Sequence, residues 1–509
     1  MNLNPETIVC HGEGLTLPSQ FAERMRTMLG KEFEAFCASY AAPAHPSLRV
    51  NPLKISPCRL KEIAPFLGDC VPWQENGFYY PADGEIRPGK HPLHEAGAYY
   101  IQEASAMLPA SLCPPAPGER VLDLCAAPGG KATQLAAALG GEGLLIANEI
   151  HPTRAGILSQ NIERMGVRNA VVTNATPAEL AAKFPAFFDK IVVDAPCSGE
   201  GMFRKEADAV AMWSPENVAL CADRQAEILD EAAKMLRVGG YLTYSTCTFA
   251  PAENEGAVLA FLLRHPEFEV VPSAEAAVVA SREKGLLEGG HPEWVEGFEA
   301  YPEALREAVR STYRVLPHHC DGEGHFAALL KKTAEGEAAP LPRKDDKSER
   351  RKSKKGAKAE PAPEGTAMKL FKAFAMEILG GVPDWVRDTT PRLFGDRLYL
   401  IPKALAEGDP TDVLKGLKVL RAGLCVGSIL GLDRGRSRFE PDHALAMALP
   451  EGTQTHEADE TAAVAFLRGE TLPADGKGWH VVTFAGLPLG WGKASDGIMK
   501  NHYPKGLRW

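Results

Sequence analysis

Arg120-Val-Leu-Asp-Leu-Cys-Ala-Ala-Pro-Gly-Gly-Lys131 joins a short apolar run to a glycine-rich turn. The apolar run is typical of a buried strand, and the Ala- and Leu-rich stretch up to Leu139 predicts a helix that ends at Gly140-Gly141. Glycine lets the backbone approach a ligand closely, and a helix N-terminus offers free N–H groups. The segment therefore predicts a strand–turn–helix unit with a small-molecule site at its turn.

The same alternation of strands and helices continues to Leu330. Further strands are predicted at 143–149, 170–174, 189–194, 240–245 and 324–330, and further helices at 152–165, 215–236 and 252–264. Ser214 and Pro215 suit the N-cap and the first position of the longest helix. This order predicts an α/β domain with a doubly wound, parallel, Rossmann-like sheet, whose ligands bind outside the carboxyl ends of the strands.

The chain of 509 residues is long enough for about three domains, and a change in composition marks the main boundary. Residues 331–366 are rich in Lys, Glu, Ala, Pro and Ser, so we expect a flexible basic linker. Residues 1–92 contain an amphipathic helix (21–36) and a loop-rich stretch, which predicts a small α+β domain. The α/β domain then spans 93–330. Residues 367–509, with a helical piece and short strands, predict one or two accessory domains.

Net charge and cysteine usage narrow the class of protein. A net charge of −10 argues against a general polyanion binder, yet 343–358 holds nine Lys or Arg against three acidic residues, and 477–509 holds five against one. Eleven cysteines without a C-x-x-C pair predict neither a zinc site nor a disulfide framework. We expect a cytoplasmic protein without membrane contact. Free thiols indicate a reducing compartment, and the sequence has neither a signal-peptide pattern nor an apolar run of about 18 residues.

The glycine-rich turn can be compared with three nucleotide-like ligands. A phosphate-binding loop needs G-x-x-x-x-G-K-[ST], but Cys125 replaces the first Gly and Ala132 the hydroxyl residue, and the dinucleotide pattern G-x-G-x-x-G is absent. S-adenosylmethionine has no phosphates and needs only a tight turn and an acidic residue for its ribose. Glu149 ends the second strand, where it meets such a ribose. A plain strand–helix turn with a surface carboxylate is the alternative.

Two cysteines follow strands of the predicted sheet, in Asp194-Ala-Pro-Cys197 and Ser245-Thr-Cys247. A thiolate that adds to C6 of a pyrimidine makes C5 nucleophilic, and C5 can then take a methyl group from a sulfonium. Asp194 closes its strand where the carboxylate can reach the ring, although a loop cap is the alternative role. The arrangement predicts methylation of a pyrimidine in nucleic acid through a covalent cysteine adduct.

Either thiol can be the nucleophile on this evidence. Pro196-Cys197 with Glu216-Asn-Val218 looks like the arrangement of DNA cytosine methyltransferases. Ser214-Pro215, however, places the tripeptide at the start of a helix rather than in a strand. The DNA-type scheme also leaves Cys247 without a role.

The segments Asp123–Lys131, Asp194–Lys205 and Tyr244–Thr248 resemble motifs of the Sun/Fmu family of RNA cytosine 5-methyltransferases. The resemblance implies that Cys247 is the nucleophile, that Cys197 assists product release and that Asp194 contacts the cytosine. The covalent chemistry with these roles needs no metal. The resemblance places S-adenosylmethionine against Cys125, Ala126, Ala127, Pro128, Gly129, Gly130, Lys131, Glu149 and Asp194, with Thr176 as the best-aligned adenine-side position.

The flanks are similar to the RsmF-type bacterial branch, which modifies small-subunit ribosomal RNA. They are Leu17–Arg26, His94–Met107 and the tail from Gly490 to Trp509, which resembles a PUA-like RNA-binding end. In this tail Lys493, Lys500, Lys505 and Arg508 interleave with Trp491, Tyr503 and Trp509, as in proteins that bind phosphates and stack on unpaired bases. An ordinary β-domain core with solvated lysines is the alternative.

The partner implied by this resemblance is RNA, as small-subunit ribosomal RNA or a subunit particle, bound by a monomeric enzyme. Two rival functions stay open. One is a tRNA cytosine 5-methyltransferase, and the other is a noncatalytic RNA-binding assembly factor that keeps the fold. The presence of both thiols and of Asp194 argues against the noncatalytic rival.

Overall fold

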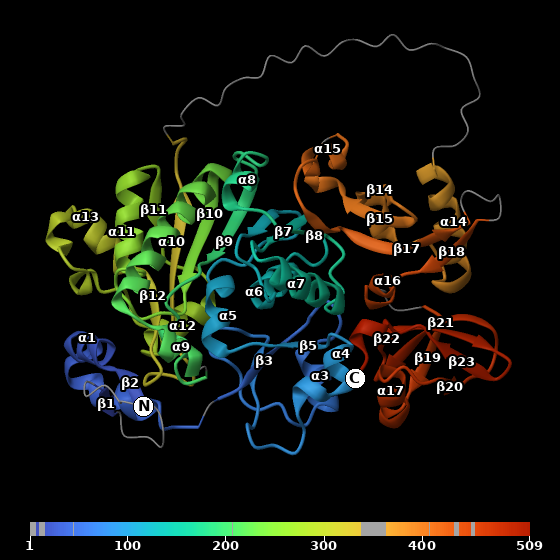
Figure 1. Cartoon of the computed structure of the whole chain (residues 1–509), viewed down its shortest axis with the longest axis horizontal. Coiled ribbons are helices and arrows are strands. Elements are labelled where there is room, and N and C mark those ends of the chain that lie inside the picture. Colours follow the sequence, from blue (N-terminus) through green and yellow to red (C-terminus); the bar gives the residue numbers. More distant parts are fainter. Residues whose placement is uncertain are drawn as a thin grey trace, which may run out of the picture.

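A nine-stranded sheet lies at the centre of the computed structural model (Figure 1). The structure describes residues 7–9, 16–43, 45–205, 207–336, 363–406, 408–431, 437–448 and 453–509. The strands of the sheet are β6 (Arg120–Asp123), β7 (Leu144–Asn148), β8 (Ala170–Thr173), β9 (Phe188–Asp194), β10 (Leu236–Thr246), β11 (Phe268–Val270), β12 (Tyr313–Val315), β13 (His325–Lys332) and β16 (Val419–Ala422). Their order is β11-β13-β10-β9-β6-β7-β8-β16, and β12 pairs with β13.

The five strands from β10 to β8 are mutually parallel, as the alternating sequence predicts. The chain first builds β6, β7 and β8 in one direction and then returns to place β9 and β10 on the other side of β6. The strand order therefore reverses between β6 and β9. In doubly wound sheets a crevice for ligands opens at this point, beyond the carboxyl ends of the strands.

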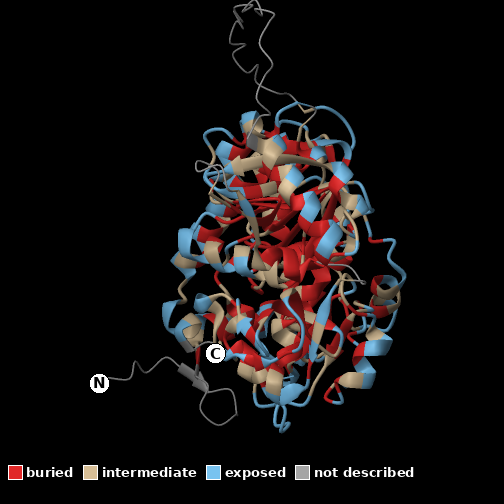
Figure 2. Ribbon diagram, turned by 90° about the vertical axis from the view of Figure 1, so that its right-hand side faces the viewer, coloured by how far each residue is buried: buried red, intermediate tan, exposed pale blue. Residues whose placement is uncertain are grey.

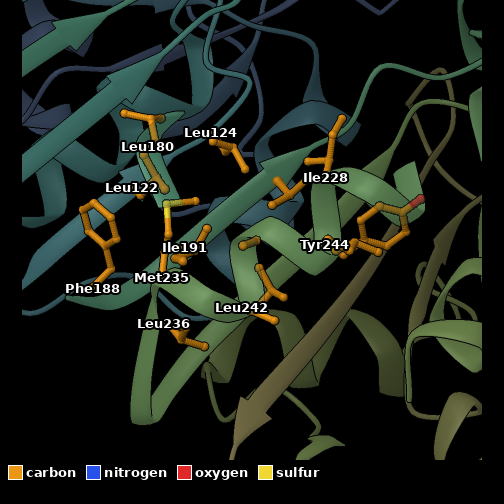
Figure 3. Packing of buried hydrophobic residues seen from close by; sticks show 14 of the residues in the cluster. Leu122, Leu124, Leu180, Phe188, Ile191, Ile228, Met235, Leu236, Leu242 and Tyr244 are labelled. Carbon is orange, nitrogen blue, oxygen red and sulfur yellow. The ribbon is translucent and has the colours of Figure 1, made fainter. Parts of the chain in front are cut away.

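Helices cover both faces of this sheet. They are α5 (Ala104–Ser111), α6 (Gly130–Ala138), α7 (Pro152–Arg164), α8 (Pro177–Ala181), α10 (Pro215–Met235), α11 (Glu255–Arg264), α12 (Ala276–Glu283) and α13 (Glu303–Val309). Leu122 packs with α8, α10 and α11 on one face, whereas its neighbour Val121 packs with α6 and α7 on the other. This follows from the alternation of side chains along a strand. Figure 3 shows Leu122, Ile191, Ile228 and Leu242 meeting in the first of these cores.

The longest helix begins as its sequence predicts. Ser214 caps α10 by accepting a hydrogen bond from the backbone N–H of Asn217 at 3.1 Å, and Pro215 occupies the first turn. The tripeptide Glu216–Val218 is therefore helical, which confirms that it is unrelated to the strand-borne tripeptide of DNA cytosine methyltransferases. The β10 strand is longer than expected, because it starts at Leu236 and contains an irregularity before Tyr241.

The N-terminal residues occupy two places. The helices α1 (Ser19–Leu29) and α2 (Phe33–Ser39) pack their phenylalanines against Phe203, Phe249 and Leu316 of the α/β domain. A separate antiparallel sheet consists of β4 (Gly77–Tyr79), β3 (Ser47–Val50) and β5 (Tyr99–Ile101). It lies beside α3 (Pro57–Ile63) and α4 (Pro92–Glu95) in Figure 1. Since β5 pairs with β3, this sheet continues beyond the boundary expected at residue 92.

The C-terminal part, which begins with α14 (Pro363–Ile378), forms two further sheets. The first contains β14 (Thr389–Phe394), β15 (Arg397–Pro402), β17 (Leu424–Leu430) and β18 (Arg438–Pro441). The second contains β19 (Thr455–Ala458), β20 (Leu472–Pro473), β21 (Gly478–Phe484), β22 (Leu487–Ser495) and β23 (Ile498–Asn501). The expected linker overlaps β13 and α14 at its ends, and its basic run at 343–358 lies outside the described residues.

The C-terminal part is also joined to the rest of the molecule. Strand β16 pairs antiparallel with β8 at the edge of the central sheet, and α17 (Glu460–Leu467) shares a core with residues of β3 and α4. Figure 2 shows the buried residues gathered along the middle of the molecule, with exposed residues outside. None of the helices in the described part of the chain combines the length and the hydropathy needed to cross a lipid bilayer.

Candidate active site

The turn after β6 has the backbone that its glycines predict. Gly129 has φ of 121°, and a Cβ atom there would lie 3.3 Å from Leu158 Cδ1 and 3.4 Å from Asn161 Cβ, so only glycine fits without strain. Helix α6 begins at Gly130, and Arg49 from β3 donates a hydrogen bond to the Gly130 carbonyl at 2.8 Å. Within the turn, burial raises the pKa of the Cys125 thiol, which is therefore neutral. The N-terminal sheet thus holds the glycine-rich turn in place.

Asp194, at the end of β9, is the point where three side chains of the site meet. Lys131 Nζ donates to Asp194 Oδ2 at 2.7 Å, Ser245 Oγ donates to Oδ1 at 2.8 Å, and His325 Nε2 lies 3.4 Å from Oδ1. Burial alone would raise the pKa of this carboxyl group, but the Lys131 charge and His325 outweigh burial and hold it below its usual range. Asp194 is therefore a carboxylate, which can only accept hydrogen bonds.

Asp123 is a second carboxyl group at this edge of the sheet, and it has a different environment. It is fully buried, and neither of its oxygens has a partner within ordinary hydrogen-bond geometry among the described residues. Burial raises its pKa to about 8, and the nearby Asp194 carboxylate adds to the shift. Buried polar atoms nearly always have partners. The orphaned Asp123 carboxyl group beside the turn therefore fits a ligand that carries hydroxyl or amino groups.

Glu149 directly follows β7, and Thr176 follows β8, as the sequence predicts. The buried Glu149 side chain accepts from the His151 N–H at 2.8 Å and lies 3.5 Å from Arg154. Thr176 caps α8, because its hydroxyl accepts from the Glu179 N–H and donates to the Glu179 carboxylate at 2.9 Å. The contact of Thr176 with a cofactor stays a prediction, and its hydroxyl already has this capping role.

The two thiols that follow β9 and β10 meet at the same edge. The sulfur atoms of Cys197 and Cys247 are 3.3 Å apart. The hydrogen bond with Cys247, together with burial, raises the pKa of Cys197 well above its ordinary value. Cys197 is therefore protonated, and either sulfur can be the donor in this contact. The contact places a protonated thiol beside the Cys247 sulfur.

A buried carboxyl group, Glu253, fixes the two cysteine-bearing segments relative to each other. Its side chain accepts from the Ser198 N–H at 3.0 Å and from Gln225 Nε2 at 2.9 Å, and it also bonds the Ser198 hydroxyl. Its backbone carbonyl accepts from the Tyr244 hydroxyl at 2.6 Å. Glu253 thus links the residue after Cys197 to the strand that leads to Cys247. Burial raises its pKa to about 7.

The titration of Glu253 gives a stability prediction. A carboxyl group whose pKa rises from 4.5 to about 7 on folding stabilises the fold fully below pH 4.5 and loses this contribution as pH rises through 7. We expect the free energy of unfolding of the native protein to fall by roughly 3 kcal/mol across this window relative to Glu253→Gln, which keeps the shape but cannot ionise. Urea unfolding of both proteins from pH 4.5 to 8 measures this. Parallel pH profiles would contradict the assignment.

Two aromatic residues of the tail are not available to stack on RNA bases, contrary to the interpretation from the sequence. Trp491 and Tyr503 are buried. Trp491 donates its indole N–H to the Asp442 carbonyl at 2.8 Å, and the Tyr503 hydroxyl lies 3.3 Å from Glu95 Oε2. The interpretation is therefore wrong for these two, because the Trp491 ring lies in a core within the C-terminal part and the Tyr503 ring lies in a core shared with the N-terminal sheet.

A different aromatic group lies near the surface of the same sheet. The Lys493 ammonium lies 5.0 Å from the centre of the Trp479 ring, and the exposed His502 ring lies 4.5 Å from it. Lys493, Lys500, Lys505 and Trp509 are exposed. The tail therefore keeps a basic surface with two indole rings, those of Trp479 and Trp509, of which the sequence spacing did not single out Trp479.

Sequence reasoning also missed three residues of the site. His325 is the first residue of β13, and its sequence suggested only a strand. Arg49 and Glu253 lie on segments that contact the site from elsewhere in the chain. Asp123 was part of the quoted motif without a role of its own. A buried charged residue inside an apolar strand is the one pattern in the sequence that could have indicated His325.

Comparison with known families covers nearly the whole chain. The family model described as "N-terminal domain of 16S rRNA methyltransferase RsmF" matches residues 17–104, and "16S rRNA methyltransferase RsmB/F" matches 110–331. "RsmF rRNA methyltransferase first C-terminal domain" matches 373–449, and "Methyltransferase RsmF PUA domain" matches 453–509. The chain therefore has the fold expected from its sequence, a Rossmann-like methyltransferase domain with an N-terminal domain and a PUA domain.

Individual relatives agree with these matches. "Ribosomal RNA small subunit methyltransferase F" from Klebsiella pneumoniae is 33% identical over 508 residues, which cover 96% of each chain. The protein of the same name from Vibrio cholerae is 31% identical and covers 97% of this chain and 98% of its own. A solved "Methyltransferase Homolog Protein from Pyrococcus Horikoshii" superposes with a TM-score of 0.52 at 28% identity and covers 62% of this chain and 95% of its own. "NSun6 from Pyrococcus horikoshii with SFG", at 21% identity and a TM-score of 0.51, shares the fold. The chain belongs to the family of ribosomal RNA small subunit methyltransferase F and is an RNA methyltransferase.

Proposed function

We propose that this methyltransferase transfers a methyl group from S-adenosylmethionine to C5 of cytosine in small-subunit ribosomal RNA, through a covalent adduct with Cys247. The observation that carries the proposal is the 3.3 Å separation of the Cys197 and Cys247 sulfurs at the sheet edge that also holds Asp194. The names of the relatives from Klebsiella and Vibrio support the RNA substrate. We further propose a monomer in the cytoplasm, since one chain supplies both thiols and the cofactor turn.

The charge of Asp194 supports cytosine as the target base. Cytosine presents an amino group at C4, which donates hydrogen bonds, whereas uracil presents an oxygen there, which accepts them. An ionised Asp194 can only accept, so it fits cytosine and repels the uracil oxygen. Lys131 at 2.7 Å keeps this carboxylate ionised and oriented. The target base leaves its stack to reach the site.

The two thiols divide the covalent chemistry between them. The Cys247 thiolate forms a bond to C6, and the electron pair of the C5=C6 double bond moves into the ring and makes C5 nucleophilic. After C5 is methylated, solvent takes the proton from C5, the electron pair of that C–H bond re-forms the C5=C6 double bond, and the bond between C6 and Cys247 breaks to release the Cys247 thiolate. Cys197 lies beside the Cys247 sulfur and assists this release, since its S–H gives a proton to the departing thiolate.

The residues around the turn fit a cationic sulfonium cofactor. S-adenosylmethionine, when bound, supplies an electrophilic methyl group. The turn at 125–131 gives close backbone approach, Glu149 lies where a ribose is expected, and the orphaned Asp123 carboxyl group can bond a hydroxyl or amino group. The Asp194 carboxylate also places a negative charge at the edge of the sheet that holds this turn.

Gly129→Ala should weaken cofactor binding. An alanine at φ of 121° carries about 1–3 kcal/mol of backbone strain, and its Cβ would press on Leu158 and Asn161. We expect the dissociation constant for S-adenosylmethionine to rise at least about tenfold by titration calorimetry. The matched control is Gly140→Ala, which also has positive φ (61°) but open space around its Cβ at the far end of α6. Equal effects of the two substitutions would contradict the assignment of the turn.

Transfer of a labelled methyl group tests the proposed function. The purified protein is incubated with labelled S-adenosylmethionine and, separately, with small-subunit ribosomal RNA, assembled small subunits and tRNA. We expect label in cytosine of ribosomal RNA, and bisulfite sequencing of RNA from a deletion strain should show the loss of the same modified site. Label in tRNA alone would replace the proposed substrate, and no transfer to any of the three would favour a noncatalytic RNA-binding protein.

A further inference from the structure

A group of metal-ligand side chains lies apart from the thiols. His318 and His319 belong to the segment between β12 and β13, and Glu32 ends the short helix η1 (Gly30–Glu32) between α1 and α2. Glu32 Oε2 lies 3.0 Å from His318 Nε2 and 2.9 Å from His319 Nε2, and the three ligand atoms all lie within 4.8 Å of one another. We propose that Glu32, His318 and His319 bind one divalent transition-metal ion of the Zn²⁺ type.

The two imidazoles are held in a converging arrangement. His318 and His319 are adjacent in sequence, yet both direct Nε2 to the same carboxylate oxygen, and their ring centres are 4.1 Å apart. The His318 side chain is only 4% exposed, and its ring meets the edge of Phe36 in α2. Two neutral imidazoles and a carboxylate are a common ligand set for zinc. A site fixed by packing needs little rearrangement to bind the ion.

The spacing of the ligand atoms suits a metal ion. Ligand atoms of a tetrahedral ion at about 2.0–2.1 Å lie about 3.3–3.4 Å apart, so the present 2.9–3.0 Å contacts need to open only slightly.

An outer carboxylate completes the arrangement on the far side of His319. Glu288 Oε1 lies 3.3 Å from His319 Nδ1, and its other oxygen lies 3.5 Å from His291 Nε2. The Glu288 contact is an ion-pair distance and not a hydrogen bond, so Glu288 contributes negative charge beside the His319 ring. The Glu32 side chain is 53% exposed, so solvent can supply a further ligand. The expectation of no metal rested on the lack of C-x-x-C pairs and on covalent chemistry that needs no metal, and this cluster uses no cysteine.

The position of the site indicates a structural role. The ion would join η1, and with it α1 and α2, to the segment that continues into Gly324 and His325 beside the thiols. The same N-terminal unit already contacts the loop after Cys197, because Arg24 bonds Glu200 at 2.6 Å and Phe21 packs on Phe203. Metal binding would therefore stabilise the attachment of α1 and α2 over this loop without a part in methyl transfer.

Equilibrium dialysis against Zn²⁺ tests the proposal on the full-length protein after treatment with a chelator. We expect about one tightly bound ion per chain and a higher melting temperature with Zn²⁺. His318→Gln, His319→Gln and Glu32→Gln should each weaken binding at least about tenfold. The matched control is His45→Gln, since this histidine lines the same surface cavity as His319 but faces Asp321, and it should leave binding unchanged.

Co²⁺ separates this site from the catalytic thiols, which can also bind a soft metal. The proposed site should give the visible bands of nitrogen and oxygen ligation without the intense thiolate charge-transfer band. The proposal is overturned if no ion binds, if bound Co²⁺ shows thiolate ligation, or if the three cluster variants bind as tightly as the His45→Gln control. Methyl transfer by the metal-free protein is measured separately, so the outcome is independent of the proposed function.

Discussion

Cys247→Ala is expected to abolish methyl transfer to RNA. Without the sulfur no adduct forms at C6, so C5 stays a poor nucleophile, and the rate should fall by at least about 10⁴-fold. Binding of S-adenosylmethionine should change little, because the cofactor turn lies at the end of a different strand, β6, and its backbone is fixed independently by Arg49. The measurement is label transfer to small-subunit RNA together with calorimetry for the cofactor.

Cys113→Ala is the matched control for Cys247→Ala. Cys113 is a partly buried cysteine that packs with α5 and α12, away from the pair of thiols. We expect its removal to leave the transfer rate within about twofold of the native value, as is usual for a small change away from the site. Retained turnover in Cys247→Ala would exclude this residue as the nucleophile and would transfer the role to Cys197.

Cys197→Ala should produce the opposite kind of defect. Addition of Cys247 and methylation of C5 would still occur, but release would be slow, so the protein should accumulate covalently linked to RNA. On a denaturing gel we expect a slowly migrating complex that contains most of the enzyme at equal concentrations of enzyme and RNA. Turnover should fall by about 10²–10⁴-fold, which is the range for loss of a positioned proton-transfer group.

The double variant Cys197→Ala/Cys247→Ala shows whether the trapped complex depends on Cys247. It should give no complex, because the 3.3 Å pair then lacks both sulfurs. A complex that persists in the double variant would mean that another residue is linked to RNA. A Cys197→Ala variant that turns over normally and traps nothing would remove Cys197 from the release step.

The central sheet could be predicted from sequence because its information is local. Each strand is a short apolar run, each helix has its own start and stop residues, and Ser214-Pro215 begins α10 as expected. Local patterns give no information about pairing between distant segments. The pairing of β16 with β8, and the separation of α1 and α2 from the β3–β5 sheet, are decided by packing between residues far apart in the chain.

Some residues of the candidate site could also be predicted from local patterns, and others could not. Asp194, Cys197 and Cys247 could be placed together because each follows a parallel strand, and such strands end at one edge. His325 lies on the antiparallel strand β13, whose start, not its end, lies at this edge, so the rule that found the other residues excludes it. The prediction that Trp491 and Tyr503 stack on RNA was wrong for a different reason. Aromatic residues that alternate with lysines are also typical of a β-strand with one buried and one exposed face.

Strand β16 has a consequence for how this enzyme can be shortened. Val419–Ala422 pairs with β8 at the edge of the central sheet. A fragment that ends at residue 336 would therefore expose unpaired backbone N–H and C=O groups along β8. Such edges recruit other chains and promote aggregation. The C-terminal part therefore also covers the edge of the central sheet, so we expect the α/β domain and the C-terminal part not to be exchangeable between proteins as independent modules.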